Sequence, residues 1–280
     1  MVQKKHLIAV DLDGTLLNKD HRISEQNKNA LIHAMEQGHI VVIATGRPSR
    51  ASMQYYRELK LKTPMVNFNG ALIHHPTDSR WKTTHSPLQH DTALKIVDAC
   101  YELDVPNIMA EVQDSVFIDR YDENFVSFFQ ALEAEDTQST LTIGSLRKKL
   151  TEDPTSLLIA PTEQQVELLQ NELNKSHAEL VEHRNWAAPW NIIEIVRKGI
   201  HKAVGLKKIS NYFGIPQERI IAFGDEDNDL EMIDYAGVGV AMGNAIDELK
   251  NIAKHITDTN ENSGVASFLT EYLQLKPIHK

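Results

Sequence analysis

The 280-residue sequence contains a single cysteine, Cys100, so it cannot form a disulfide within one chain. It also lacks the run of about 18 apolar residues that a membrane-spanning helix needs. The apolar run near the N-terminus covers only residues 7–10 and ends at Asp11, too short for the apolar region of a signal peptide. These absences predict a cytoplasmic protein with no membrane association, in which Cys100 is a small buried side chain of a helix.

Basic residues are scarce relative to acidic ones, with 29 Lys and Arg against 39 Asp and Glu and a net charge of −10. A chain with this balance is poorly suited to general binding of a phosphate backbone, so nucleic acid is not expected as a partner. A local basic pocket could still receive a small anion. Hydrophobic residues make up 41% of the chain, which is enough to build a sizeable core.

Five short apolar or β-branched runs predict strands that are buried on both faces, as in a parallel sheet. The runs are LIAV (7–10), IVVIAT (40–45), PMVNFNG (64–70), RIIAFGD (219–225) and GVGVAMG (237–243). Helical patterns lie between them, such as the one that Ser24 is expected to cap. Strands that alternate with helices form right-handed βαβ units, so the sequence predicts an α/β fold with a Rossmann-like, doubly wound parallel sheet.

Between residues 84 and 188 the pattern changes, and the segment has an apolar core of its own. Residues 90–103 predict an amphipathic helix, and residues 162–173 predict another that begins with a capping box. Strand candidates surround these helices. We therefore expect a discontinuous core domain, residues 1–83 and 189–280, with a smaller α+β domain, residues 84–188, inserted into it.

Polar residues follow four of the predicted strands at the point where each strand ends. They are Asp11 and Asp13, then Thr45, Gly46 and Arg47, then Asn67 and Asn69, and finally residues 225–229 with the sequence DEDND. In an open parallel sheet, ligands bind beyond the carboxyl ends of the strands. The sequence therefore predicts one site to which these groups contribute.

The carboxylates of this site predict a metal ion, because gathered carboxylates repel one another unless a cation lies among them. Oxygen ligands without His or Cys favour Mg²⁺, which keeps open positions for water and a substrate phosphate. We assign Asp11, Asp13 and Asp225 to the metal. Glu226 is expected to contact it directly or through water, and Asp229 to orient the other ligands.

Four stretches, in order along the chain, resemble the motifs of the haloacid dehalogenase superfamily. They are DLDGT (11–15), ATGR (44–47), a lysine within RKGIHKAVGLKKI (197–209) and GDEDNDLEM (224–232). NFNGALI (67–73) and residues 239–269 are similar to the Cof-type phosphatases, whose cap domain is inserted between the second and third motifs. The resemblance covers residues 6–83 and 189–275, whereas the inserted segment matches the cap only by position and size.

The resemblance implies a hydrolase that works through an aspartyl phosphate. Asp11 would attack phosphorus, and Asp13 would protonate the leaving alcohol and later accept a proton from the hydrolytic water. Lys202 would supply positive charge to the transition state. Arg47 would either brace its loop or reach the substrate. The remaining phosphate ligands implied are Thr45, the N–H groups of Gly46 and Leu12, and the side chain of Asn228.

The predicted function is therefore that of a Mg²⁺-dependent phosphatase, a phosphoric monoester hydrolase acting on a small phosphorylated metabolite. Sugar phosphates, pyridoxal phosphate and flavin mononucleotide are the candidate substrates. A phosphomutase acting on sugar phosphates is one alternative, and a non-catalytic sensor of phosphorylated ligands is another. The complete set of Asp11, Asp13, Lys202 and Asp225 argues against the sensor, since a pure binder would not need Asp13 as an acid.

Overall fold

The computed structural model describes residues 4–131, 139–185 and 191–275. No helix within these ranges is both long and apolar enough to cross a membrane. The chain forms two compact units. We call the first, residues 1–47, 54–84 and 201–280, the core unit, and the second, residues 48–53 and 85–200, the inserted unit.

The core unit contains a five-stranded parallel sheet in the order β14-β13-β12-β1-β2. Its strands are β1 (Leu7–Val10), β2 (Ile40–Ile43), β12 (Ile220–Gly224), β13 (Val238–Ala241) and β14 (His255–Ile256). β1 lies between β12 and β2, and its four residues are completely buried. This explains the unbroken apolar run LIAV, and the predicted α/β fold with a parallel sheet is confirmed.

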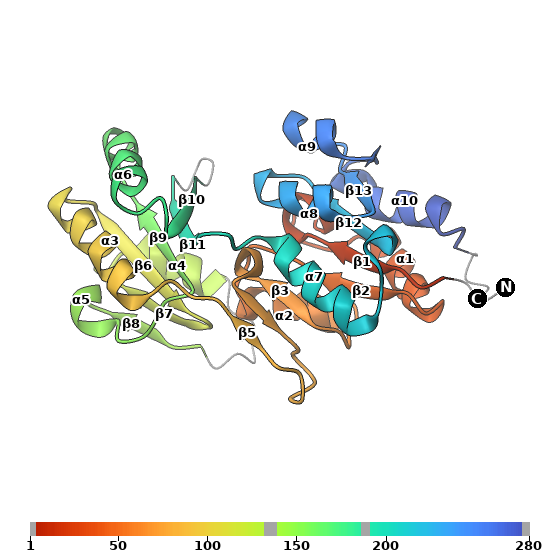
Figure 1. The fold of residues 1–280 in the computed structure, drawn as a ribbon, viewed down its shortest axis with the longest axis horizontal. Helices are drawn as coiled ribbons and strands as arrows, with labels where there is room; N and C mark the ends of the chain where they lie inside the picture. Colours follow the sequence, from red (N-terminus) through yellow and green to blue (C-terminus); the bar gives the residue numbers. More distant parts are fainter. Residues whose placement is uncertain (1–3, 132–138, 186–190, 276–280) are drawn as a thin grey trace. The chain divides into compact units, whose positions relative to one another are not determined.

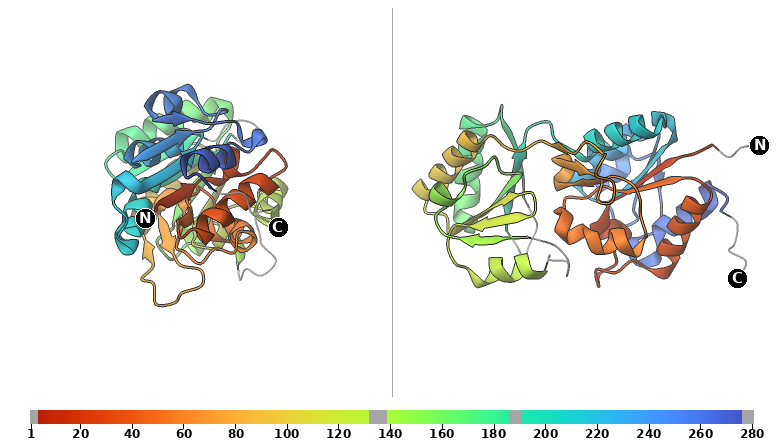
Figure 2. Two further views of the ribbon diagram at one scale, coloured as in Figure 1. Left: turned by 90° about the vertical axis from the view of Figure 1, so that its right-hand side faces the viewer. Right: turned by 90° about the horizontal axis from the view of Figure 1, so that it is seen from below.

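Helices cover both faces of this sheet, as the right-hand view of Figure 2 shows for α7 on one side and α1 and α10 on the other. The helices of the unit are α1 (Glu25–Glu36), α7 (Lys202–Phe213), α8 (Leu230–Tyr235), α9 (Asp247–Ile252) and α10 (Gly264–Tyr272). A further helix, α2 (Ser49–Glu58), begins in the inserted unit and ends in the core unit. Ser24 caps α1 as expected, since its side chain accepts the N–H of Asn27. A second, small sheet consists of β3 (Met65–Asn67), β4 (Leu72–His74) and β5 (Thr84–His85), in that order (Figure 1).

The inserted unit is built on a six-stranded, mainly antiparallel sheet in the order β10-β11-β9-β6-β7-β8. Its strands are β6 (Asn107–Val112), β7 (Ser115–Ile118), β8 (Leu141–Ile143), β9 (Ser156–Ala160), β10 (Val181–Asn185) and β11 (Ile193–Arg197). Its helices are α3 (His90–Glu102), α4 (Glu123–Ala131), α5 (Leu146–Lys149) and α6 (Glu163–Ser176). Cys100 is completely buried in its core, and burial raises the pKa of the thiol to about 12.

Two segments expected in the core domain lie in the inserted unit. Residues 48–53 do so because the buried Arg50 forms an ion pair with Glu111 of β6, while its N–H donates to Asp114 at 2.9 Å. The other segment, of which residues 191–200 are described, contains β11, and this strand pairs with β9 and β10 of the inserted unit. The expected boundary at residues 188 and 189 lies outside the described residues.

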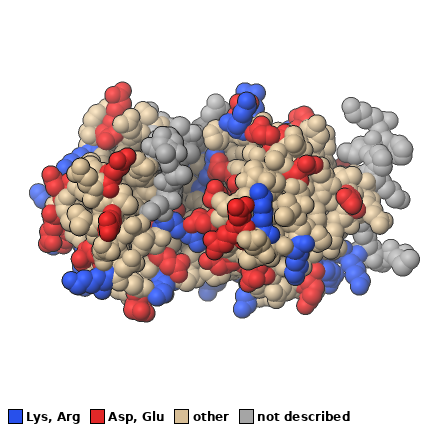
Figure 3. Space-filling model, turned by 90° about the horizontal axis from the view of Figure 1, so that it is seen from above, with Lys and Arg blue, Asp and Glu red and all other residues tan. Residues whose placement is uncertain are grey.

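On the face of the molecule shown in Figure 3, Lys and Arg side chains are scattered among Asp and Glu. They do not gather there into a continuous basic surface of the kind that follows a phosphate backbone.

Candidate active site

The first two groups of the site are placed by neighbouring strands, because Asp11 directly follows β1 and Asp225 directly follows β12. The N–H of Asp11 donates to the carbonyl of Phe223 at 3.2 Å. The chain then turns through Gly14, whose φ is +69°, and a Cβ at this position would lie 2.0 Å from Asp225 Oδ2. Only glycine fits this close approach. Thr15 Oγ1 donates to Asp225 Oδ1 at 2.7 Å, which fixes the second carboxylate next to the turn.

Three buried carboxylates meet here, and we call Asp11, Asp225 and Asp229 the acidic cluster. Each offers an oxygen that lies within 4.8 Å of the others. Lys202, at the start of α7, is completely buried and donates to Asp11 Oδ1 at 2.8 Å and to Asp229 Oδ1 at 2.7 Å. One ammonium faces three carboxylates, so the cluster keeps an excess of negative charge when all three are ionised.

Both carboxylate oxygens of Asp229 accept hydrogen bonds from other groups of the protein. Oδ1 accepts from Lys202, and Oδ2 accepts the N–H groups of Asp225 at 2.9 Å and Glu226 at 3.3 Å. Asp229 therefore holds both the lysine and the loop that carries Asp225. Glu226 lies at the exposed rim of this loop, outside the acidic cluster.

Burial is the largest influence on the pKa values of Asp11 and Asp225. It raises the pKa of Asp11 well above its usual range, although Lys202 opposes the change. Burial likewise raises the pKa of Asp225 to about 7, against the hydrogen bond from Thr15. Burial alone would lower the pKa of Lys202, but the carboxylates of Asp11 and Asp229 outweigh it and raise the pKa. The lysine thus stays charged at neutral pH, while the ionised carboxylates need a further cation.

Asp13 lies outside the acidic cluster. Its side chain is about half exposed, and both of its oxygens accept from Arg47, at 2.6 Å from Nε and 2.5 Å from Nη2. Although burial opposes it, this bidentate pair raises the pKa of Arg47. The guanidinium also lies 5.5 Å from the ring centre of Tyr55. The structure therefore brings together the expected acid and Arg47, whereas Asp13 is not among the carboxylates that meet in the acidic cluster.

Gly46 and Asn228, two of the expected phosphate ligands, lie close to each other. Thr45 is buried at the end of β2, and its Oγ1 accepts the N–H of Arg47 at 3.1 Å. Asn228 Nδ2 donates to Asn69 Oδ1 at 3.0 Å, and both amides lie close to the α-carbon of Gly46. Leu12 is buried at the beginning of the turn after Asp11. Asn69, one of the polar residues that we expect at this edge of the sheet, has no assigned role in the prediction, and the structure places it against Asn228.

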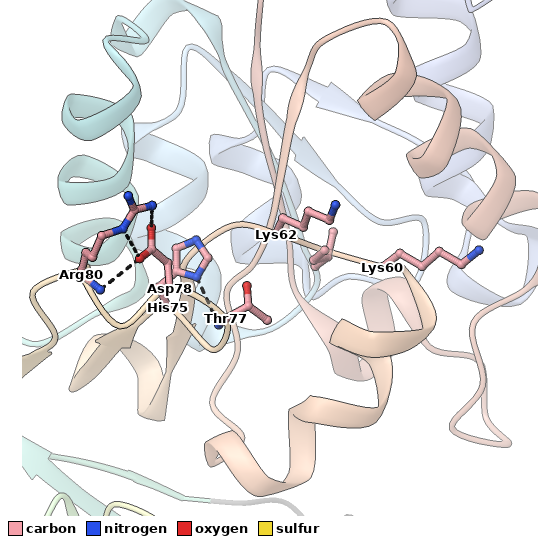
Figure 4. A pocket seen from close by; sticks show the side chains of 7 residues that line it. Lys60, Lys62, His75, Thr77, Asp78 and Arg80 are labelled. Atoms are coloured by element: carbon pink, nitrogen blue, oxygen red, sulfur yellow. Dashed lines mark hydrogen bonds and ion pairs between the residues drawn. The ribbon is translucent and has the colours of Figure 1, made fainter.

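A separate hollow with a volume of about 550 Å³ lies elsewhere on the core unit, with basic side chains around it (Figure 4). Arg80 is turned toward Asp78, to which its Nε and Nη2 donate at 2.9 Å each, while Lys60 and Lys62 point away from that pair. The charged groups do not converge on one point. The hollow therefore lacks the arrangement of the acidic cluster and its neighbours.

Comparison with known proteins identifies the family. A family model described as haloacid dehalogenase-like hydrolase matches residues 8–269. The chain belongs to this family. The fold agrees with this, since a haloacid dehalogenase-like hydrolase from Bacteroides thetaiotaomicron superposes with a TM-score of 0.81 at 26% identity, covering 96% of this chain and 100% of that one.

Two curated relatives are named phosphatases. The 5-amino-6-(5-phospho-D-ribitylamino)uracil phosphatase YitU of Bacillus subtilis is 50% identical over 275 residues, covering 98% of this chain and 100% of that protein. The pyridoxal phosphate phosphatase YbhA of Escherichia coli is 29% identical over 273 residues, covering 95% and 98% of the two chains. The predicted family and the predicted enzyme class, a haloacid dehalogenase-type phosphoric monoester hydrolase, are confirmed.

Proposed function

We propose that this protein is a Mg²⁺-dependent phosphatase that hydrolyses 5-amino-6-(5-phospho-D-ribitylamino)uracil. The observation that carries the proposal is the 50% identity to the Bacillus subtilis phosphatase named for that substrate, over 98% of this chain and all of the relative. The similarity therefore includes the inserted segment, which the motifs do not cover. Two further Bacillus subtilis relatives with the same substrate in their names are each 31% identical.

The acidic cluster supports a role for Mg²⁺. Its oxygen-only donors and the raised pKa values of Asp11 and Asp225 match a hard divalent cation, which would stabilise the ionised carboxylates. Asp11 and Asp225 would hold the ion, and Asp229 would orient Lys202 and the Asp225 loop. When bound, the ion would neutralise charge on the phosphoryl group.

The protein's own residues account for the two proton transfers and the attack. Lys202 holds Oδ1 of Asp11, which leaves Oδ2 to attack phosphorus and form the aspartyl phosphate, with the P–O bond to the ribityl oxygen breaking. Asp13 delivers a proton to that oxygen and afterwards removes one from the attacking water. Both carboxylate oxygens of Asp13 accept from Arg47, so Asp13 has to leave Arg47 before it can act as the acid.

A substrate panel tests the proposal. Phosphate release from the ribitylaminouracil phosphate, flavin mononucleotide, pyridoxal phosphate and sugar phosphates would be measured with Mg²⁺ and with EDTA. We expect the ribitylaminouracil phosphate to have the highest kcat/KM, by about tenfold or more, and EDTA to abolish release. Asp11→Asn should be inactive, whereas Asp227→Asn, which changes an exposed carboxylate of the same region, should retain activity.

Three outcomes would overturn the proposal. A preference for pyridoxal phosphate or a sugar phosphate would assign another substrate. Transfer of the phosphoryl group to a sugar instead of water would identify a phosphomutase. Binding of phosphorylated ligands without any release would identify a sensor.

A further inference from the structure

The short turn Phe68–Gly70, which we call the FNG turn, is joined by hydrogen bonds to the loop that follows β2. The N–H of Phe68 donates to the carbonyl of Arg47 at 3.2 Å, and the N–H of Asn69 donates to the carbonyl of Thr45 at 3.1 Å. Just before the turn, Asn67 Nδ2 also donates to the carbonyl of Arg47, at 2.9 Å. The FNG turn therefore sets the position of the proposed phosphate-binding loop.

The same turn lies against the start of α7. Gly70 has a φ of +103°, and a Cβ on it would lie 2.5 Å from the carbonyl oxygen of His201. His201 directly precedes Lys202, which enters the acidic cluster. A larger residue at position 70 would push this backbone away, so the turn also sets the distance to the helix that carries the lysine.

Asn69 extends these contacts to the fourth motif. Its Oδ1 accepts from Asn228 Nδ2 at 3.0 Å, and its side chain is almost fully buried. A Cβ on Gly46 would lie 3.2 and 3.3 Å from the amide atoms of Asn69 and 3.5 Å from Asn228 Nδ2. The two amides therefore lie over the bare α-carbon of Gly46, and a side chain at that position would crowd them.

The backbone of Asn69 is left-handed, with φ 52° and ψ 27°. Few residues other than glycine adopt this conformation readily, and asparagine is among those that do. Asn228 depends on this neighbour, because its Oδ1 is buried without a hydrogen-bond partner among the described residues. The bond to Asn69 is thus the contact that fixes the plane of the Asn228 amide.

We propose that Asn69 is a positioning residue of the phosphate site. An amide nitrogen carries two hydrogens. Asn69 accepts one from Asn228, and this directs the other toward a phosphoryl oxygen held by Thr45 and Gly46. The inference rests on the proposed phosphatase function, but it does not depend on which phosphate ester is the substrate.

The test uses Asn69→Gly, which keeps the left-handed backbone at no cost and deletes only the amide. The inhibition constant of inorganic phosphate and kcat/KM for an aryl phosphate would be measured for wild type, Asn69→Gly, Asn228→Ala and the double variant. We expect Asn69→Gly to raise the inhibition constant of phosphate and to lower kcat/KM, each by about tenfold, which is the effect of losing about one hydrogen bond to a charged group. The double variant should match Asn228→Ala within about twofold, because Asn69 acts through Asn228.

The matched control is Lys60→Gly, which places glycine at another left-handed position of the core unit (φ 53°) and should leave both constants unchanged. Normal phosphate inhibition in Asn69→Gly would overturn the inference, as would losses that multiply in the double variant. A fall in Tm of more than about 5 °C in Asn69→Gly would make Asn69 a structural residue instead. A wild type that neither binds nor releases phosphate would overturn the proposed function itself.

Discussion

Replacing Asp229 with asparagine should destabilise the core unit, although the two side chains have nearly the same shape. Asp229 Oδ1 accepts from Lys202 at 2.7 Å, while Oδ2 accepts the N–H groups of Asp225 and Glu226. An amide has one acceptor oxygen and one NH₂ group, which only donates. In either orientation of the amide, the NH₂ group faces another donor.

The size of the effect follows from burial. Asp229 and Lys202 are both completely buried, and removing one partner of a buried ion pair costs about 3–5 kcal/mol. Lys202 keeps its bond to Asp11 at 2.8 Å, so the lower half of that range applies. At about 2–4 °C per kcal/mol for a chain of this order of size, Tm should fall by roughly 6–16 °C.

Thermal unfolding followed by circular dichroism in EDTA measures this difference without a contribution from metal. The control is Asp227→Asn, two residues earlier in the same 3₁₀ turn, where the carboxylate is exposed and the change should stay within about 0.5 kcal/mol. A Tm of Asp229→Asn within about 2 °C of the wild-type value would contradict the view that the hydrogen bonds of both Asp229 oxygens stabilise the fold.

Three other predictions concern Arg47, Asp225 and His39. Arg47→Met should lower kcat by about tenfold or more and leave KM almost unchanged, because Arg47 orients Asp13; a higher KM at constant kcat would instead indicate substrate contact. Because burial raises the pKa of Asp225 to about 7, Mg²⁺ must displace a proton at lower pH, so its stabilisation of Tm should weaken below pH 7; a pH-independent shift would contradict this. Burial beside His6 lowers the pKa of His39 to about 4, so the folded protein should lose stability as pH falls from about 6.5 toward 4. His39→Gln should reduce this loss, and a Tm that falls with pH as steeply in the variant as in wild type would refute the assignment.

The residues of the acidic cluster could be predicted from the sequence for a specific physical reason. Unbroken apolar runs identify strands buried on both faces, and the first polar residues after such strands lie at the common carboxyl edge of a parallel sheet. Asp11 and Asp225 follow from this rule without any knowledge of strand order. The position of Lys202 came instead from the family motif, because nothing in the local pattern distinguishes it from Lys207 or Lys208.

Other features depend on information that residue patterns do not carry. Residues 48–53 begin a regular helix, and long-range contacts such as the ion pair of Arg50 with Glu111, 61 positions away, and the bond from its N–H to Asp114 join them to the inserted unit. The left-handed conformation of Asn69 is equally hidden, since asparagine occurs in many other conformations. Long-range pairing and individual dihedral angles are properties of the folded chain.

The order of the strands also explains where the side chain of Asp13 lies. β1 lies between β12 and β2, with Val10 paired to Phe223 on one side and to Ile43 on the other. The first pairing brings Asp11 beside Asp225, whereas the second brings the residues after β1 beside the loop that contains Arg47. A carboxylate two positions after Asp11 has a guanidinium within reach on that side, and a bidentate pair with it is favourable. The binding of a metal by Asp13 stays a prediction, and the pairing of β1 with β2 accounts for the contact that its carboxylate makes with Arg47.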